Sequence, residues 1–178
     1  MKVALARHGE TPYNAQRRFQ GHLPVGLSDR GREQAHELAR LAAQREWAAL
    51  YCSPLHRARE TADIVGAVIG RHPIEDARFA ETDTGDWTDR FFDEVAAAEP
   101  ERYAAWHGGD PTFAFPGGES FAAQQLRVLE GIDAVRAGPV PALVICHRGT
   151  IRLALAALHS DDAQRRAEIH NAALLELP

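Results

Sequence analysis

Short apolar runs that alternate with helix-like segments are the feature that most restricts how this chain can fold. The runs VALA (3–6), ALYCS (49–53) and ALVIC (142–146) have the length and composition of strands buried on both faces. Each run is followed by a segment with apolar residues at helical spacing. Because parallel strands need crossover connections of this kind, the order of elements predicts an α/β fold with a mostly parallel central sheet between two layers of helices.

Cap and turn residues mark the ends of several predicted elements. Ser28 can cap the first long helix, and Gly70 can end a helix that begins near Leu55. The other predicted elements are a short strand within 73–80, an irregular helical segment at 89–107 that contains Pro100, helices at 121–136 and 150–158, and a last strand at 171–177. The segment from about 86 to 120 is expected to be a helical and loop insertion over one end of the sheet, within a single domain that spans 1–178.

Charge and hydropathy exclude some classes of protein. The net charge of −5 argues against a nucleic-acid-binding protein, which usually carries a basic excess. No apolar run approaches the length that spans a bilayer, and Arg7, His8 and Glu10 interrupt the first apolar stretch too early for a signal peptide. We therefore expect a cytoplasmic protein that binds neither nucleic acid nor membranes.

Chemically active side chains follow the predicted strands at their carboxyl ends, the edge where open α/β sheets bind ligands. The strand ends lead into Arg7-His8-Gly9, SPLHRARETA (53–62) with Arg57, Glu81, and His147-Arg148-Gly149. Each of these residues alone is compatible with a structural role. Their joint position at one sheet edge predicts a binding site.

Two arginines and two histidines at one edge suit a phosphate group. Arg7 and Arg57 would form a positively charged oxyanion site, because guanidinium groups pair with phosphate through two hydrogen bonds. A neutral histidine can attack phosphorus and form a phosphohistidine, and a carboxylic acid can protonate the leaving alkoxide. Glu81 is placed for that role, with Asp83 and Asp86 as nearby rivals.

A metal site is the competing interpretation of His8, His147 and Glu81. The neighbouring arginines would repel a cation, and these three residues show no ligand pair at i, i+4 spacing. Arginines and histidines can themselves neutralise phosphoryl oxygens, so we expect chemistry that uses neither a metal nor another cofactor.

These residues belong to blocks that resemble the histidine phosphatase superfamily, also called the phosphoglycerate mutase-like family. The matching blocks are RHGETPYN (7–14), SPLHRARETA (53–62), ETDTGDW (81–87), FPGGES (115–120), ICHRG (145–149) and NAALLEL (171–177). They resemble, in turn, the family's R-H-G-x-T-x-x-N signature, its S-x-L-x-R-A-x-x-T-A block, its E-x-x-x-G-x-W segment, its P-x-G-E-S loop, its V-x-H-G block and its closing strand. RHG alone would carry little weight, but the blocks follow the family order over most of the chain.

The resemblance implies a role for each matching residue of the strand-end site. His8 would be the phosphorylated nucleophile and Glu81 the proton donor. Arg7, Arg57 and His147 would complete the phosphate pocket.

It also implies features beyond these five residues. Asn14 would lie beside the phosphate and Gln20 near it, whereas Ser53 would be a structural turn residue. The implied fold is a three-layer α/β/α sandwich of phosphoglycerate mutase type. The implied ligands are small phosphomonoesters, with no metal requirement, and related proteins are often homodimers.

Two positions depart from the family pattern. Arg148 stands where a second glycine is common; it either adds positive charge to the pocket, as part of the substrate-binding set, or points into solvent. Thr88-Asp89 stands where Glu-Gly is common, which concerns the shape of the entrance loop rather than the catalysis.

The short chain favours hydrolysis over return of the phosphoryl group to the same ligand. Family mutases are longer and carry larger insertions that close over the site. We therefore expect a phosphoric monoester hydrolase of the broad-specificity or α-ribazole phosphatase kind. The alternatives are mutase-type phosphoryl transfer and a non-catalytic module that binds phospho-ligands.

The insertion is the expected specificity wall. Its aromatic residues are Trp87, Phe91, Trp106, Phe113 and Phe115, which Phe19 and His22 would join from the first loop. These rings either stack on a ring of the substrate or pack the insertion onto the sheet. Arg17 and Arg18 either hold a second anionic group or lie solvated.

Overall fold

The computed structural model describes residues 3–158 and 168–178, and within these ranges five strands form one sheet. The strands are β1 (Val3–Arg7), β2 (Ala49–Cys52), β3 (Pro73–Glu75), β4 (Ala142–Cys146) and β5 (Leu174–Glu176). Their order is β3-β2-β4-β1-β5, and all neighbours are parallel except β5, which runs antiparallel to β1. The predicted mostly parallel sheet is confirmed.

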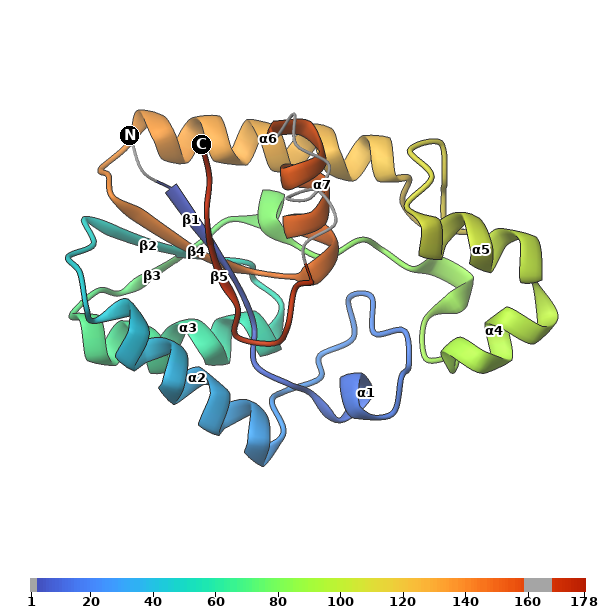
Figure 1. Ribbon diagram of the computed structural model, residues 1–178, viewed down its shortest axis with the longest axis horizontal. Coiled ribbons are helices and arrows are strands. Elements are labelled where there is room, and N and C mark those ends of the chain that lie inside the picture. Colours follow the sequence, from blue (N-terminus) through green and yellow to red (C-terminus); the bar gives the residue numbers. More distant parts are fainter. Residues whose placement is uncertain (1–2, 159–167) are drawn as a thin grey trace.

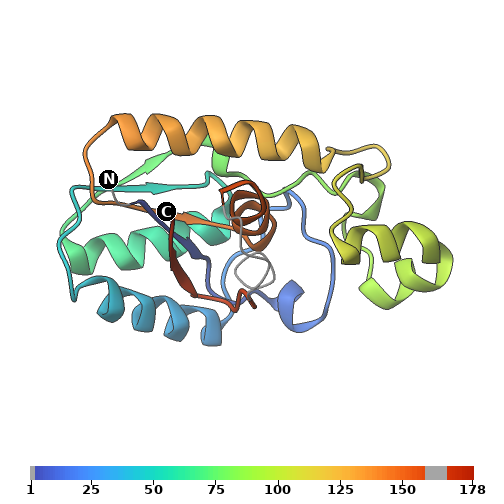
Figure 2. The ribbon, with the colours of Figure 1, turned by 45° about the horizontal axis from the view of Figure 1, so that its top comes forward.

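Helices cover both faces of this sheet. The helices in the described ranges are α1 (Pro12–Ala15), α2 (Asp29–Ala42), α3 (His56–Ile69), α4 (Phe92–Ala98), α5 (Pro100–Gly108), α6 (Phe121–Ala137) and α7 (Arg148–Leu158), with short 3-10 turns η1 (Ala77–Phe79) and η2 (Gly85–Trp87). α2 and α3 lie on one face, and α6 and α7 lie on the other (Figures 1 and 2). The fold therefore has the three expected layers.

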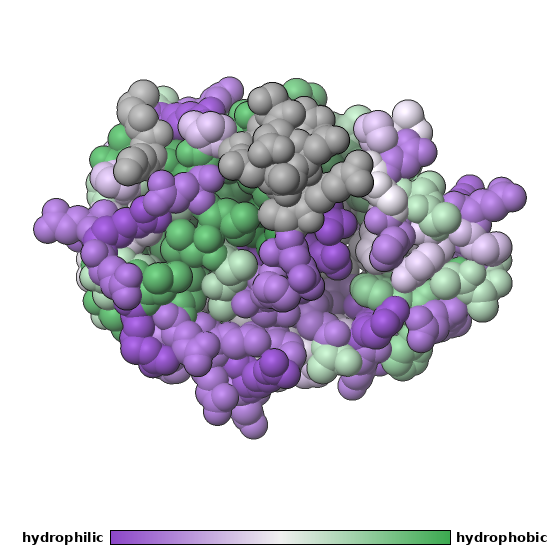
Figure 3. Space-filling view, in the orientation of Figure 1, coloured by the Kyte–Doolittle hydropathy of each residue, from purple (hydrophilic) through white to green (hydrophobic). Residues whose placement is uncertain are grey.

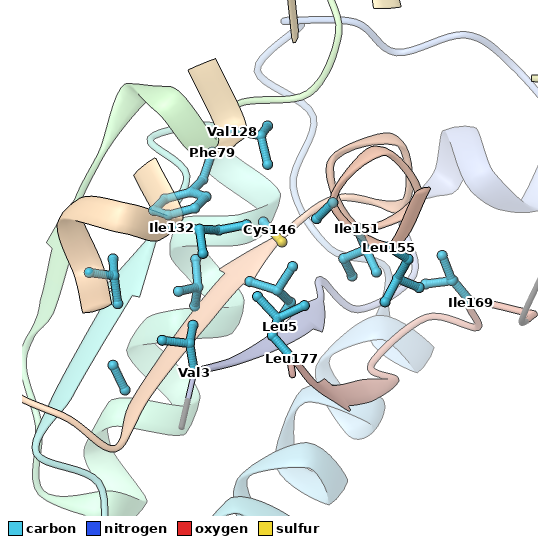
Figure 4. Close-up of a cluster of buried hydrophobic side chains, with 14 of the residues drawn as sticks. Val3, Leu5, Phe79, Val128, Ile132, Cys146, Ile151, Leu155, Ile169 and Leu177 are labelled. Atoms are coloured by element: carbon cyan, nitrogen blue, oxygen red, sulfur yellow. The ribbon is translucent and has the colours of Figure 1, made fainter. Parts of the chain in front are cut away.

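The side-chain alternation along β1 explains why this strand is apolar throughout. Val3 and Leu5 pack with residues of α6 and α7 in one buried cluster, part of which Figure 4 shows. Ala4 and Ala6 point to the opposite face and pack with residues of α2 and α3. A polar residue at any of these four positions would be buried. Truncation of a core residue such as Ile132 to alanine would cost about 2–5 kcal/mol of folding free energy.

Local signals in the sequence place several helix ends correctly. The Ser28 hydroxyl accepts a hydrogen bond from the backbone N–H of Gly31 (3.0 Å) and caps α2. Gly70 has a left-handed φ of 68° and ends α3. The irregular segment around Pro100 is two helices, because proline removes a backbone donor and suits the first turn of a new helix: α4 ends at Ala98 and α5 begins at Pro100.

The carboxyl ends of β1, β2 and β4 lie at the same edge of the sheet. Arg7 pairs in register with Cys146, and the backbone N–H of His8 donates to the Cys146 carbonyl (3.0 Å). The N–H of Ser53 donates to a carbonyl of β4 (2.9 Å), so the ladder continues past β2 as well. This register brings His8, His147 and Ser53 together.

The segment that contains α4 and α5 projects beyond this edge, away from the end of the sheet where β1 begins and β5 ends (Figures 1 and 2). An isolated bridge between Arg18 and Phe91 ties it to the loop that follows α1. No helix in the described ranges is long and apolar enough to cross a membrane.

Candidate active site

A cavity of about 530 Å³ opens where the strand ends face the α4–α5 segment. Hydrophilic residues gather on this part of the surface, to the left of the α4–α5 segment in Figure 3. Seven predicted site residues line the cavity: Arg7, His8, Asn14, Gln20, Arg57, Glu81 and Arg148. The eighth, His147, is fully buried beside His8, with the two ring centroids 5.1 Å apart. The structure thus brings the predicted residues together.

His8 is buried and held in one orientation. Its Nδ1 lies 2.6 Å from the carbonyl oxygen of Gly9, and because a carbonyl only accepts, Nδ1 carries the proton. Burial, with smaller contributions from the charges of Arg57 and Arg7, holds the pKa of His8 well below its ordinary value. The imidazole is therefore neutral at pH 7, and its Nε2 keeps a free lone pair.

Three buried side-chain nitrogens have no hydrogen-bond partner among the described residues: Nε of Arg7, Nε of Arg57 and Nδ1 of His147. Other nitrogens of the same arginines are held, since Nη1 of Arg7 donates to the Ile169 carbonyl (2.8 Å) and Nη2 of Arg57 donates to the Gly21 carbonyl (2.9 Å). Leaving a buried donor unpaired costs about 1–3 kcal/mol. Three such nitrogens in one site indicate that a ligand supplies the acceptors.

The cavity is strongly positive although the chain as a whole is acidic. Among the described residues, six arginines and one carboxylate line it: Arg7, Arg17, Arg18, Arg57, Arg148, Arg152 and Glu81. Burial is the main cause that lowers the pKa of Arg7 and of Arg57 to about 10, so both remain charged at pH 7. An anion is the ligand that this field attracts.

Ser53 forms the hydrogen bond expected of a turn residue and also contacts His147. Its hydroxyl accepts a hydrogen bond from the backbone N–H of Leu55 (3.2 Å), as a turn residue would. The same hydroxyl lies 2.7 Å from Nε2 of His147. Burial and the charge of Arg57 lower the pKa of His147 well below its ordinary value. With the Ser53 hydroxyl donating its proton to Nε2, the single proton of the neutral ring lies on Nδ1, which is left to donate to a ligand.

Glu81 is positioned by hydrogen-bond donors to both of its carboxylate oxygens. Its Oε1 accepts hydrogen bonds from the backbone N–H of Thr82 (3.0 Å) and from Nε2 of Gln124 (3.2 Å). Its Oε2 accepts one from the backbone N–H of Gly149 (3.2 Å). A Cβ atom at Gly149 would lie 2.3 Å from Oε1, so this position has to be glycine for the carboxylate to sit here.

The carboxylates that rivalled Glu81 in the sequence lie elsewhere. Asp83 and Asp86 are both exposed, and neither lines the cavity. The Asp83 carboxylate instead accepts a hydrogen bond from the backbone N–H of Gly85 (3.0 Å) and stabilises the turn.

Helix α1 and the loop that follows it supply the two predicted amides, Asn14 and Gln20. Oε1 of Gln20 accepts a hydrogen bond from the Thr11 hydroxyl (2.8 Å), and Oδ1 of Asn14 accepts one from the Thr11 backbone N–H (3.1 Å). Asn171, which the sequence analysis did not place in the site, also lines the cavity and donates to Oδ1 of Asn14 (3.3 Å) and to the His8 carbonyl (3.1 Å). Its place at the head of the NAALLEL block was the signal that could have found it.

The aromatic residues of the 86–120 segment divide between packing and the cavity. Trp87, Phe113 and Phe115 are buried in one cluster with Phe19; Trp87 and Phe113 serve packing alone, whereas Phe19 and Phe115 also reach the cavity. The aromatic side chains that line the cavity are Phe19, Phe92, Tyr103, Trp106, Phe115 and Phe121. Phe91, predicted to belong to the wall, is exposed and lies against the Arg18 guanidinium at 4.7 Å, outside the cavity.

Residues 3–158 and 168–178 form no group of three or more histidine, cysteine, aspartate or glutamate side chains that could hold a metal ion.

Comparison with known families decides how this site is classified. Residues 3–178 match the family model of the histidine phosphatase superfamily, branch 1. The chain belongs to this superfamily. Its relatives within the superfamily include phosphatases and phosphoglycerate mutase-like proteins.

Two curated relatives and one solved structure illustrate the similarity. The chain is 42% identical over 119 residues to the glucosyl-3-phosphoglycerate phosphatase of Mycolicibacterium vanbaalenii, which covers 67% of this chain and 52% of the relative. It is 32% identical over 162 residues to the adenosylcobalamin/α-ribazole phosphatase of Salmonella typhimurium, which covers 89% and 79%. The structure of mycobacterial glucosyl-3-phosphoglycerate phosphatase with VO3 has a TM-score of 0.90 at 30% identity and covers 99% of this chain and 90% of that one. The chain spans about half the length of the first curated relatives that it matches.

Proposed function

We propose that this histidine phosphatase superfamily member hydrolyses small phosphate monoesters through a covalent phosphohistidine at His8, without a metal ion. The observation that carries this proposal is the environment of His8. A neutral imidazole has its Nδ1 fixed by the Gly9 carbonyl, which leaves Nε2 free as a nucleophile beside three unpaired donor nitrogens.

In this proposal, the unpaired donors bind the phosphoryl group. Nε of Arg7, Nε of Arg57 and Nδ1 of His147 are pre-positioned for phosphoryl oxygens, and the two arginines supply positive charge, with the Arg57 side chain buried. Asn14 and Gln20 line the same cavity and would hydrogen-bond the remaining oxygens.

The first chemical step is transfer of the phosphoryl group to the enzyme. Nε2 of His8 forms a bond to phosphorus while the bond between phosphorus and the ester oxygen breaks. Glu81, in its protonated form, gives its proton to the leaving alkoxide. The N–H groups that hold the Glu81 carboxylate keep it at a fixed place in the cavity.

The second step releases phosphate. The Glu81 carboxylate takes a proton from a water molecule, whose oxygen bonds to phosphorus while the bond between Nε2 of His8 and phosphorus breaks. Inorganic phosphate leaves, and the enzyme returns to its starting state. Mutase-type transfer differs only here, because the acceptor would be the bound ligand instead of water.

The side of the cavity opposite the strand ends would select the alcohol part of the ester. The aromatic side chains of the 86–120 segment that reach the cavity form an apolar wall. We propose that this segment belongs to the same single domain as the sheet. Substrates of the relatives range from glucosyl-3-phosphoglycerate to α-ribazole esters, as their names state. We propose a small phosphomonoester as the substrate, and its structure is developed below.

The test is hydrolysis of p-nitrophenyl phosphate in slightly acidic buffer that contains EDTA. Wild type should turn over, and His8→Ala should lose at least about a thousandfold in kcat while keeping its circular dichroism spectrum. His36→Ala, which changes an exposed histidine of α2 outside the cavity, is the matched control and should match wild type. Equal rates in wild type and His8→Ala, or loss of wild-type activity on chelation, would overturn the proposal.

A further inference from the structure

Two arginines of α7 line the cavity without a carboxylate partner. Arg148 and Arg152 make no ion pair and no side-chain hydrogen bond with any residue in the ranges that the structure describes, and both border the cavity that holds His8. Their i, i+4 spacing places them on one face of the helix. Burial, and then the charge of Arg148, lower the pKa of Arg152, as expected for neighbouring cations that share no anion.

Most of the described arginines, in contrast, are ion-paired. Nine other described arginines each form an ion pair with a carboxylate: Arg30, Arg32, Arg45, Arg59, Arg78, Arg90, Arg102, Arg127 and Arg136. Arg17 and Arg18, which seemed from the sequence able to hold a second anionic group, are paired as well, with Asp93 (3.3 Å) and Asp89 (2.5 Å). The uncompensated positive charge of the cavity therefore lies at the phosphate pocket and on α7.

These two positive regions are continuous. The charge of Arg148 is close enough to Arg7 to lower the pKa of Arg7, and Arg148 in turn acts on Arg152. The cationic surface thus extends from the phosphate pocket along the first turns of α7, where Leu153 and Ala156 complete the wall. A cavity of about 530 Å³ has room for much more than a phosphate ion.

We propose that Arg148 and Arg152 form a second anion subsite, and that the substrate is a phosphomonoester whose leaving alcohol carries a second anionic group, either a carboxylate or another phosphate. The inference rests on the proposed phosphatase function and adds the substrate class. Forked guanidinium groups bind either anion through paired hydrogen bonds.

Matched substrate pairs test the proposal. 3-Phosphoglycerate and glycerol 3-phosphate differ only in a carboxylate against a hydroxymethyl group. Fructose 1,6-bisphosphate and fructose 6-phosphate differ in one phosphate. In wild type, kcat/KM should favour the more anionic member of at least one pair by about tenfold or more, the factor expected from charge-assisted hydrogen bonds. The pair that shows the preference identifies the anion.

Variants then locate the subsite. Arg148→Gln and Arg152→Gln should each reduce the preference, measured as the ratio of the two kcat/KM values, by about tenfold. Arg152→Lys should keep part of it, because an ammonium group retains the charge and loses the fork. Arg40→Gln changes an exposed arginine of α2 outside the cavity and should leave the ratio unchanged.

Two results would overturn the subsite: no preference within either pair, or a preference that both glutamine variants retain. Isothermal calorimetry on the His8→Ala background measures the same preference as a ratio of Kd values, with 3-phosphoglycerate and glycerol 3-phosphate as the ligands. This readout does not depend on turnover. If no ester is hydrolysed but the calorimetric binding preference is present, the proposed function is refuted and the subsite remains supported.

Discussion

Replacing Gly149 by alanine tests whether the position of Glu81 controls the proton-transfer step. The added Cβ would lie 2.3 Å from Oε1 of Glu81, whereas ordinary contacts begin near 3.4 Å. The carboxylate therefore has to move by about 1 Å. This movement also distorts the hydrogen bond of 3.2 Å that the wild-type carboxylate accepts from the Gly149 N–H.

The size of the expected effect follows from this displacement. A misplacement of about 1 Å in a catalytic group can cost about a hundredfold in rate, and general acid catalysis as a whole contributes about 10²–10⁴-fold. We expect kcat/KM for an alkyl phosphate, which includes the steps up to phosphoryl transfer but not the later hydrolysis of the phosphohistidine, to fall about a hundredfold. The loss with p-nitrophenyl phosphate should be several-fold smaller, because that leaving group needs little protonation.

The assay compares kcat/KM for glycerol 3-phosphate and p-nitrophenyl phosphate in wild type, Gly149→Ala and Gly108→Ala. Gly108 also lies in a helix, and a Cβ there would meet nothing within 4 Å, which makes it the matched control. Alanine suits a helical backbone better than glycine by about 1 kcal/mol, so the fold of both variants should persist in thermal melts. The reasoning is refuted if Gly149→Ala stays within about twofold of wild type on the alkyl ester, or if both esters lose activity equally.

Three further predictions concern the same site. Glu81→Gln should lower kcat/KM for glycerol 3-phosphate by about 10²–10⁴-fold and that for p-nitrophenyl phosphate much less, and equal losses in kcat/KM would argue against Glu81 as the acid. Ser53→Ala leaves Nε2 of His147 buried without its hydrogen-bond partner and should lower the free energy of unfolding by about 1–3 kcal/mol. Urea titrations measure this change, and an unchanged unfolding midpoint would contradict it. Folding lowers the pKa values of His8 and His147. At a pH below 6.5, the ordinary histidine pKa, these two rings therefore bind protons in the unfolded chain but not in the folded chain. The free energy of unfolding should therefore fall as the pH is lowered through 6.5, by up to about 1.4 kcal/mol per pH unit for each ring. Urea titrations between about pH 7 and pH 5 measure this slope, which His8→Gln should reduce; an identical slope in the variant would contradict it.

Patterns within short stretches of sequence were sufficient to predict the layers and most of the site. Apolar runs such as ALVIC indicate buried strands, and the rule that ligands meet strand carboxyl ends joins Arg7-His8 to His147 across a long separation in sequence. The break at Pro100 shows the limit of this reasoning. An irregular helical pattern predicted one segment over 89–107, although Pro100 begins a second helix there.

Contacts between distant side chains could not be predicted in the same way. The sequence indicates a turn residue at Ser53, and the hydrogen bond between Ser53 and His147 depends on the register of β2 against β4. Gln124 lies among apolar residues of α6, and no local pattern indicates that it donates to Glu81. The sequence alone indicates an ordinary helix residue at Arg152. Only the structure shows that Arg152 lines the cavity and has no carboxylate partner among the described residues.

The most direct test of the central claim is a search for phosphate bound to His8. Wild-type enzyme would be mixed with p-nitrophenyl phosphate, quenched within milliseconds in alkaline denaturant, which preserves phosphohistidine, and digested for peptide mass spectrometry. The account predicts one phosphoryl group on the peptide that contains His8, at a ring nitrogen, and none in His8→Ala. Turnover with no phosphorylated His8 in wild type, or with the phosphoryl group on His147, would contradict it.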